Sequence, residues 1–241
     1  MHRSTNIGGV TRDPPDRLPG RRREAARNDA RILEAAREVF VQDPDAPVAA
    51  VAARAGVGIG ALYRRYATKD DLLRRVCHEG LLRFIAEAEE AAGDDDAGRA
   101  LARFLRHVVD ADLHSLTVRL AGRFAPTEEM WRDAERAGAL ARALVERAVA
   151  SNVVRADAVP GDLDLILEGC AAIRVPDPSR TAELRRRHLA LLLDGLAAGG
   201  PGGLPGPAPD DGEMGWGARG EVRIVPRATT RMRDPEPVTT A

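Results

Sequence analysis

Residues 47–73 read PVAAVAARAGVGIGALYRRYATKDDLL, and this stretch decides the fold. Its alanine-rich start and the glycine at position 56 predict two short helices joined by a tight turn, because glycine readily takes the left-handed conformation that ends a helix. Another helix is expected to begin after Thr68, which has the spacing of a capping box with Asp71. The two tyrosines of the chain, Tyr63 and Tyr66, and its single lysine, Lys69, all lie within this stretch.

The two short helices have the composition of a helix-turn-helix motif over about residues 47–66. Small residues allow the helices to cross closely and apolar residues fill the angle between them: Ala52, Ala53 and Ala55, then Val51, Val57 and Leu62. Phosphate donors follow at Tyr63, Arg64, Arg65 and Lys69. In such motifs the second helix enters the major groove of DNA while the first crosses the backbone. Tyr66 has two interpretations, as a core residue or as a DNA contact.

Helical patterns continue on both sides of the motif. Residues 28–41 carry an apolar stripe at helical spacing, formed by Ile32, Leu33, Ala36, Val39 and Phe40. The expected helices of the motif cover residues 46–55 and 58–66. Further helices are expected near residues 97–112, 113–124, 127–151, 161–173 and 180–197, separated by proline and glycine. The fold class is therefore predicted to be all-α.

Both ends of the chain lack this periodicity. Residues 1–26 are expected to form a disordered basic arm ending in Arg21, Arg22, Arg23 and Arg27, which either reaches a minor groove or stays solvated. Residues 199–218 contain 8 Gly and 4 Pro, so residues 199–241 are expected to be a disordered Gly/Pro-rich tail. Folded domains are therefore expected over residues 27–75 and 76–198.

Charge differs between these regions. Residues 1–75 carry 15 Lys and Arg against 10 Asp and Glu, a net +5, whereas residues 76–198 carry 16 against 21, a net −5. A basic end on an acidic body is typical of a protein with one end facing a polyanion, although chance clustering of surface charge also produces so small an imbalance.

Composition narrows the remaining classes of protein. Cys77 and Cys170 have no metal-type spacing and are expected to be reduced, buried thiols. No signal peptide or membrane-spanning run is evident, so a soluble, cytoplasmic protein without membrane contact is expected. The five histidines are scattered and no catalytic or metal-binding pattern stands out, so we expect neither an enzyme nor a cofactor.

The run AARAGVGIGALYRRYATKDDLL closely resembles the DNA-binding domain of TetR/AcrR-type transcriptional regulators. The resemblance covers about residues 27–76 and lies in the Ala55-Gly56-Val57 turn, the Ala61-Leu62-Tyr63 triplet, Tyr66 and Lys69. It implies phosphate contacts from Tyr63 and Lys69 and a place at the groove edge for Arg64. It also implies a groove-floor position for Gly58, Ile59, Gly60 and Ala61. Val48 and Gly58 stand where the family usually carries hydroxyl residues, so direct base readout is expected to be sparse.

The same resemblance implies that the acidic body is a helical ligand-binding and dimerisation domain. The expected last helix carries more leucine than one core-facing stripe needs, which fits either a homodimer through the last two helices or a central helix of one monomer. Candidate pocket residues, although ordinary core packing is the favoured interpretation of each one singly, are Phe104, His107, His114, Phe124 and Trp131.

The predicted function is that of a homodimeric, ligand-responsive transcriptional regulator, acting as a repressor. We expect a small-molecule effector to release it from a palindromic double-stranded DNA operator. The alternative is a helical ligand-binding and dimerisation module that has lost or weakened its sequence-specific DNA recognition, in keeping with Val48 and Gly58.

Overall fold

The computed structural model of the chain describes residues 18–120, 122–199 and 202–209. Within these residues the regular structure is helical, and the only β pairing among them is an isolated antiparallel bridge between Val154 and Ala197. The predicted all-α class is confirmed. The chain divides into two compact units, residues 1–76 and residues 77–241, called here the N-terminal unit and the body.

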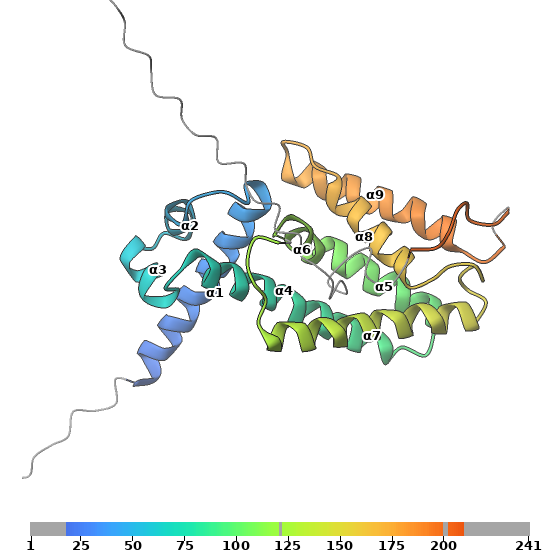
Figure 1. Cartoon of the computed structure of the whole chain (residues 1–241), viewed down its shortest axis with the longest axis horizontal. Helices are drawn as coiled ribbons and strands as arrows, with labels where there is room; N and C mark the ends of the chain where they lie inside the picture. Colours follow the sequence, from blue (N-terminus) through green and yellow to red (C-terminus); the bar gives the residue numbers. More distant parts are fainter. Residues whose placement is uncertain (1–17, 121, 200–201, 210–241) are drawn as a thin grey trace, which may run out of the picture. The chain divides into compact units, whose positions relative to one another are not determined.

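The N-terminal unit contains α1 (Leu18–Gln42), α2 (Val48–Ala55), α3 (Ile59–Arg65) and the first turns of α4 (Lys69–Ala92) (Figure 1). Helix α2 packs against both α1 and α3. The predicted stripe of α1 is buried at Ile32, Leu33, Ala36 and Phe40, and Leu62 of α3 is fully buried. Helices α2 and α3, with 8 and 7 residues, are too short to be stable singly, so their packing onto α1 and each other defines the unit.

Helix α1 begins earlier than the sequence analysis predicted. It starts at Leu18, so residues 21–23 belong to a helix and the expected disordered arm up to residue 26 is wrong for residues 18–26. This segment has no apolar stripe, but arginine, alanine and glutamate are strong helix formers that extend an already anchored helix. The rest of the expected arm, residues 1–17, lies outside the described residues.

The turn between α2 and α3 requires glycine at position 56. Gly56 has φ 66° and ψ 37°, the left-handed conformation, and the Val57 amide donates to the Ala52 carbonyl at 3.0 Å. From α1, Nη2 of Arg31 donates to the Ala55 carbonyl at 2.6 Å, which satisfies an orphan acceptor at the end of α2. A Cβ at position 56 would lie 3.0 Å from that Nη2 atom, so both the backbone and the packing favour glycine.

The body consists of the rest of α4 followed by α5 (Ala97–Asp110), α6 (Leu113–Leu120), α7 (Glu128–Ala150), α8 (Gly161–Ala172) and α9 (Pro178–Leu196). Helix α5 is central, packing against α6, α7, α8 and α9 (Figure 1). It is also strongly amphipathic, with Leu101, Phe104, Leu105 and Val108 buried. The Phe104 ring meets Phe84 of α4 edge-on, with centroids 5.0 Å apart.

A buried arginine fixes α9 to the α5–α6 turn. Arg185 of α9 donates to Oδ1 of Asp112 at 2.5 Å and to the carbonyls of Ile173 and Ala171, each at 3.1 Å. Asp112 itself has φ 50°, a left-handed conformation that aspartate tolerates, and also accepts a hydrogen bond from the Ser115 hydroxyl. The guanidinium is thus paired and hydrogen-bonded, which burial of a charge requires.

Part of the Gly/Pro-rich segment departs from the expected disordered tail. Nη2 of Arg155 donates to the Gly202 carbonyl at 2.6 Å, and the Leu204 amide donates to Oδ2 of Asp157 at 2.8 Å. Residues 202–209 are therefore attached to the body through a short Arg-x-Asp motif whose role was not visible in the sequence. The expected disorder of residues 200–201 and 210–241 concerns segments outside the described residues. No helix in the described part of the chain is long and apolar enough to cross a membrane.

Asp29 of α1 holds the end of α3. Its carboxylate receives two hydrogen bonds from Arg65, at 2.9 and 3.0 Å, and one from the Tyr66 hydroxyl at 2.5 Å. The Arg65 guanidinium, followed by the Tyr66 hydroxyl, holds the pKa of Asp29 below its usual value, although burial opposes this shift. Burial and the neighbouring carboxylate raise the pKa of Tyr66, so its hydroxyl remains a donor. Tyr66 is buried, and its interpretation as a core residue is confirmed.

This network predicts a pH-dependent contribution to stability. Asp29→Asn should lower the free energy of unfolding by about 2 kcal/mol at neutral pH, because hydrogen bonds to a charged group are lost. The lowered pKa means that the contribution is complete above the pKa of an unfolded aspartate, about 3.9, and disappears as the pH falls through the folded-state value. Urea unfolding from pH 7 downward measures the difference between wild type and variant.

Tyr66→Phe is the control for this measurement, since it removes one hydrogen bond and leaves the carboxylate. It should destabilise the protein by a smaller amount while keeping most of the acid dependence. A constant difference between wild type and Asp29→Asn throughout the acid range would contradict the assigned role of Asp29.

Candidate functional site

Helix α3 has one buried side and one exposed side. Leu62 faces the core, whereas Ile59 is 43% and Tyr63 49% exposed. Gly58, Gly60, Ala61 and Arg64 are also exposed, so all six residues predicted on this helix and at its start are accessible. An exposed isoleucine and tyrosine on so short a helix form a surface that can meet another molecule.

The two adjacent arginines at the end of α3 have different roles. Arg65 is committed to Asp29, as described above. Arg64 is exposed, and its Nη1 lies 3.7 Å from where a Cβ on Gly60 would stand, so its side chain runs back along the exposed surface of α3. Arg64 is therefore the arginine of this pair that is placed to meet a polyanion.

Lys69 begins α4 but does not extend freely into solvent. Its Nζ donates to the carbonyls of Ala46 at 2.8 Å and Pro44 at 3.3 Å, and it lies 5.2 Å from the centre of the Phe40 ring. The ammonium group thus ties α4 to the loop before α2. An ammonium has three donor hydrogens, so the predicted phosphate contact of Lys69 would use the remaining one.

The start of α4 has the capping box predicted from the sequence. The Asp71 amide donates to Oγ1 of Thr68, and the Thr68 amide donates to Oδ2 of Asp71, both at 3.0 Å. The Asp71 carboxylate also accepts from Arg74, and these partners lower its pKa, with Arg74 the largest cause. Two orphan amides are thus satisfied at this turn.

The exposed side of the first turn of α3 carries no polar side chain between Gly58 and Ala61. Gly58 is the N-cap residue and has no side chain to accept a hydrogen bond from the first turn. A Cβ at this position would have no heavy atom within 4 Å. The absence of a hydroxyl here therefore does not reflect a lack of space.

In the body, the candidate pocket residues do not converge on one cavity. Phe104 is buried in the core. His107 is exposed and pairs with Glu87 at 2.7 Å. Phe124 and Trp131 are half-buried. His114 lines a small cavity among α5, α6, α8 and α9, and the other four candidates are not part of its lining.

This cavity is small and polar on one side. Asp112, His114, Ser115, Cys170 and Arg185 are among its lining residues, and it has room for about one water molecule. Nε2 of His114 is buried and has no hydrogen-bond partner among the described residues. Burial lowers the pKa of His114 to about 4, so the ring is neutral at pH 7. Cys77 and Cys170 are buried, as the sequence predicted, and neither forms a disulfide bond in the described part of the chain.

Two residues that position the ends of α2 and α3 were not predicted from the sequence. Asp29 and Arg31 lie on α1, yet they bond residues 65, 66 and 55, far away along the chain. No local pattern links positions so widely separated. The one available signal was that both charged residues adjoin the buried stripe of α1 in sequence.

Comparison with known proteins agrees with this geometry. Residues 32–76 match the family described as bacterial regulatory proteins of the tetR family. No curated protein sequence matches the chain.

Solved structures extend the likeness to both units. A TetR transcriptional regulator from Streptomyces coelicolor has 25% identity and a TM-score of 0.53, covering 71% of this chain and 99% of that one. A TetR transcription regulatory protein from Mycobacterium vanbaalenii has 29% identity and a TM-score of 0.52, covering 73% of this chain and 99% of that one. A third, a TetR family regulator from Thermus thermophilus, shares the fold, with 23% identity, a TM-score of 0.55 and coverage of 69% of this chain and 98% of that one.

The matched segment contains α2, α3 and the capped start of α4, and the similar structures include the helical body as well. The N-terminal unit is therefore a helix-turn-helix DNA-binding domain of the tetR family, and the chain as a whole resembles TetR transcriptional regulators.

Proposed function

We propose that the protein is a homodimeric repressor that binds a palindromic operator and is released by a small-molecule effector. The observation that carries this proposal is the exposed surface of α3, from which Ile59, Tyr63 and Arg64 project. On the opposite side, Leu62 is buried in the core, and Arg65 and Tyr66 bond Asp29 of α1. A recognition helix needs this combination of a rigid support and an accessible outer face.

Contacts to phosphate would supply most of the affinity. Tyr63 offers a phenolic hydroxyl and Arg64 a guanidinium, both of which are phosphate donors. Gly58, Gly60 and Ala61 would let the backbone of α3 approach the groove floor closely, and Ile59 would contact a thymine methyl group. Lys69 would donate to phosphate through the third hydrogen of its ammonium group, since the other two are bonded to the carbonyls of Pro44 and Ala46.

Dimerisation through α8 and α9 would place two copies of α3 on the operator. These helices pack against each other, yet Leu165 of α8 is 47% and Leu191 of α9 62% exposed. Exposed leucines on adjacent helices favour a partner surface, such as a second copy of the same helix pair. The N-terminal units of the two copies, called here the heads of the dimer, would then enter major grooves about one helical turn of DNA apart. This separation is roughly 34–36 Å or somewhat more.

The effector would bind within the body, where the small cavity beside His114 contains a buried nitrogen without a partner among the described residues. The cavity has room for about one water molecule, so the helices around it would have to move apart before a larger molecule enters. Release from DNA follows only if the effector binds the open body more tightly than the DNA-bound form.

The bare surface of α3 favours one alternative, a ligand-binding and dimerisation module with lost or weak sequence-specific DNA recognition. It predicts dimers and ligand binding without a protected site in footprints of DNA upstream of the protein's own gene. The repressor predicts a protected, near-palindromic site there, which an effector removes.

Substitutions on α3 test the phosphate contacts. Tyr63→Phe and Arg64→Ala should each weaken binding to a duplex from the upstream region several-fold, because each removes one donor to the backbone. Arg64→Ala should also reduce the slope of log affinity against log salt by about 0.9, whereas Tyr63→Phe removes no charge and should leave the slope unchanged. Fluorescence anisotropy at several salt concentrations measures both quantities.

Arg83→Ala is the matched charge control, since Arg83 is exposed on the body and pairs with Glu79. It should leave the affinity and slope at their wild-type values. Wild-type affinity for both Tyr63→Phe and Arg64→Ala would refute the proposed DNA surface.

Position 58 allows a gain-of-function test. Gly58→Ser should strengthen DNA binding by about two- to tenfold, because the added hydroxyl meets open space and provides one more neutral hydrogen bond. It should also stabilise α3 by roughly a few tenths of a kcal/mol as a better N-cap. Gly58→Ala fills the same space without a hydroxyl, and equal affinities for the two variants would show that no phosphate is within reach.

The proposed dimer has its own test. Leu191→Glu should convert dimers to monomers in sedimentation velocity, because it places a charge at the centre of the proposed apolar contact. Leu82→Glu is the control, since Leu82 is comparably exposed but lies on α4. A wild-type protein that sediments as a monomer, or dimers unaffected by Leu191→Glu, would exclude this interface.

A further inference from the structure

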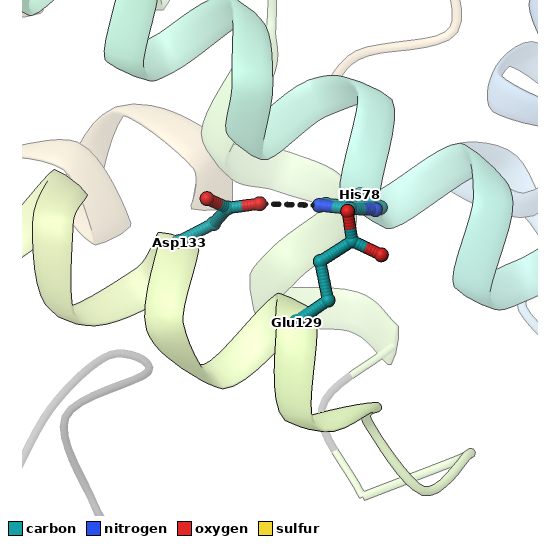
Figure 2. A group of neighbouring side chains, drawn as sticks. All are labelled: His78, Glu129 and Asp133. Atoms are coloured by element: carbon teal, nitrogen blue, oxygen red, sulfur yellow. Dashed lines mark hydrogen bonds and ion pairs between the residues drawn. The ribbon is translucent and has the colours of Figure 1, made fainter.

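Three metal-ligating side chains from two helices meet within the body. His78 lies on α4, and Glu129 and Asp133 lie on α7. Their ligand atoms, one from each residue, all lie within 4.8 Å of one another. Figure 2 shows the three side chains converging in the space between the two helices.

The sequence and the packing together explain this convergence. Glu129 and Asp133 are four residues apart, so both lie on one side of α7. Further along α7, the small residues Ala134 and Ala137 pack against Leu81 and Ile85 of α4, which brings the two helices close. The three polar side chains thus stand on rigid helical supports at the edge of an apolar contact.

We propose that His78, Glu129 and Asp133 bind a divalent transition-metal ion, with Zn²⁺ as the representative. An imidazole nitrogen with two carboxylate groups suits Zn²⁺ and its first-row neighbours, whereas Mg²⁺ and Ca²⁺ prefer ligand sets made only of oxygen. Three protein ligands leave at least one coordination position for water or a small anion. The site differs from the proposed DNA surface and from the cavity beside His114.

The geometry needs only small adjustments to accept the ion. Nε2 of His78 lies 2.6 Å from Oδ2 of Asp133, and its N–H donates to this carboxylate oxygen. Ligand atoms at about 2.0–2.2 Å from a tetrahedral Zn²⁺ are roughly 3.4 Å from one another, so the ion would replace this proton with slight separation of the pair. The side chains of His78 and Asp133 are 14% and 21% exposed, and Glu129 is exposed, which leaves a path from solvent.

Glu129 distinguishes a metal site from a simple ion pair. The His78–Asp133 hydrogen bond would hold α4 to α7 without any metal, and Glu129 takes no part in it (Figure 2). A bound cation, by contrast, would draw on both carboxylates. The ion would also link α7 to the part of α4 that belongs to the body. Helix α4 itself begins at Lys69.

The test uses the full chain with any affinity tag removed and with metal stripped by a chelator. Zn²⁺ competition against a chromophoric indicator should show one saturable site per chain in the wild type. Glu129→Gln should weaken binding by about tenfold or more, and His78→Ala by a larger factor, because each removes a direct ligand. Zn²⁺ should raise the melting temperature of the wild type more than that of either variant.

His107→Ala is the matched control, because His107 pairs with Glu87 at a similar distance of 2.7 Å but belongs to no three-ligand group in the described residues. It should bind Zn²⁺ as the wild type does. Glu129→Gln is exposed and leaves the His78–Asp133 bond in place, so a loss of affinity with an unchanged circular dichroism spectrum reports the ligand itself.

Co²⁺ provides a second measurement through its visible absorption. Bands of a nitrogen- and oxygen-ligated ion, without thiolate charge transfer, support the assigned ligands. Thiolate bands would instead assign the ion to Cys77 or Cys170 and overturn the proposal. Wild-type Zn²⁺ affinity in Glu129→Gln and His78→Ala, or no saturable site in the wild type, would overturn it as well.

Discussion

The carboxylate of Asp29 is the constraint on which the N-terminal unit depends. Helix α3 has only the residues Ile59–Arg65, too few for a stable isolated helix, and one residue, Leu62, is fully buried within it. Asp29 compensates by fixing the last turn of α3 and the residue after it from the neighbouring helix. Since Asp29, Arg65 and Tyr66 are all satisfied internally, the outer face of α3 can remain accessible without loss of order.

The basic side chains of the N-terminal unit have different structural roles. Arg31 closes the end of α2, Arg65 holds α3, and Lys69 joins α4 to the loop before α2. Arg31 and Lys69 bond backbone carbonyls at a helix end and in a loop, whereas Arg65 bonds the carboxylate of Asp29. Arg64 differs from these three residues, because its exposed side chain runs along the outer face of α3. A count of basic residues would therefore overstate the number that meet a polyanion, because several are structural.

The sequence predicted the helices well because their stripes and breakers are local. Six helices over residues 48–65 and 97–172 begin within two residues of the expected positions, and Thr68 with Asp71 caps α4 as predicted. Three features escaped prediction because they depend on distant partners. Asp29 acts across the fold, Arg155 attaches residues 202–209, and the group around His78 requires the packing of α4 against α7. Helix α1 was missed before residue 27 because its first turns carry no apolar stripe.

The bare face of α3 also constrains how a repressor of this kind would choose its operator. A bidentate base contact contributes about 1–3 kcal/mol of discrimination, and α3 offers no polar side chain for one between Gly58 and Ala61. Discrimination would then depend on DNA shape and on the distance between two heads of a dimer. In such a protein the spacing of the two heads affects operator discrimination more than it does in a protein that makes many specific base contacts in each half-site. A small movement of α4, which begins in the N-terminal unit and continues in the body, would then change operator choice more than it changes phosphate affinity.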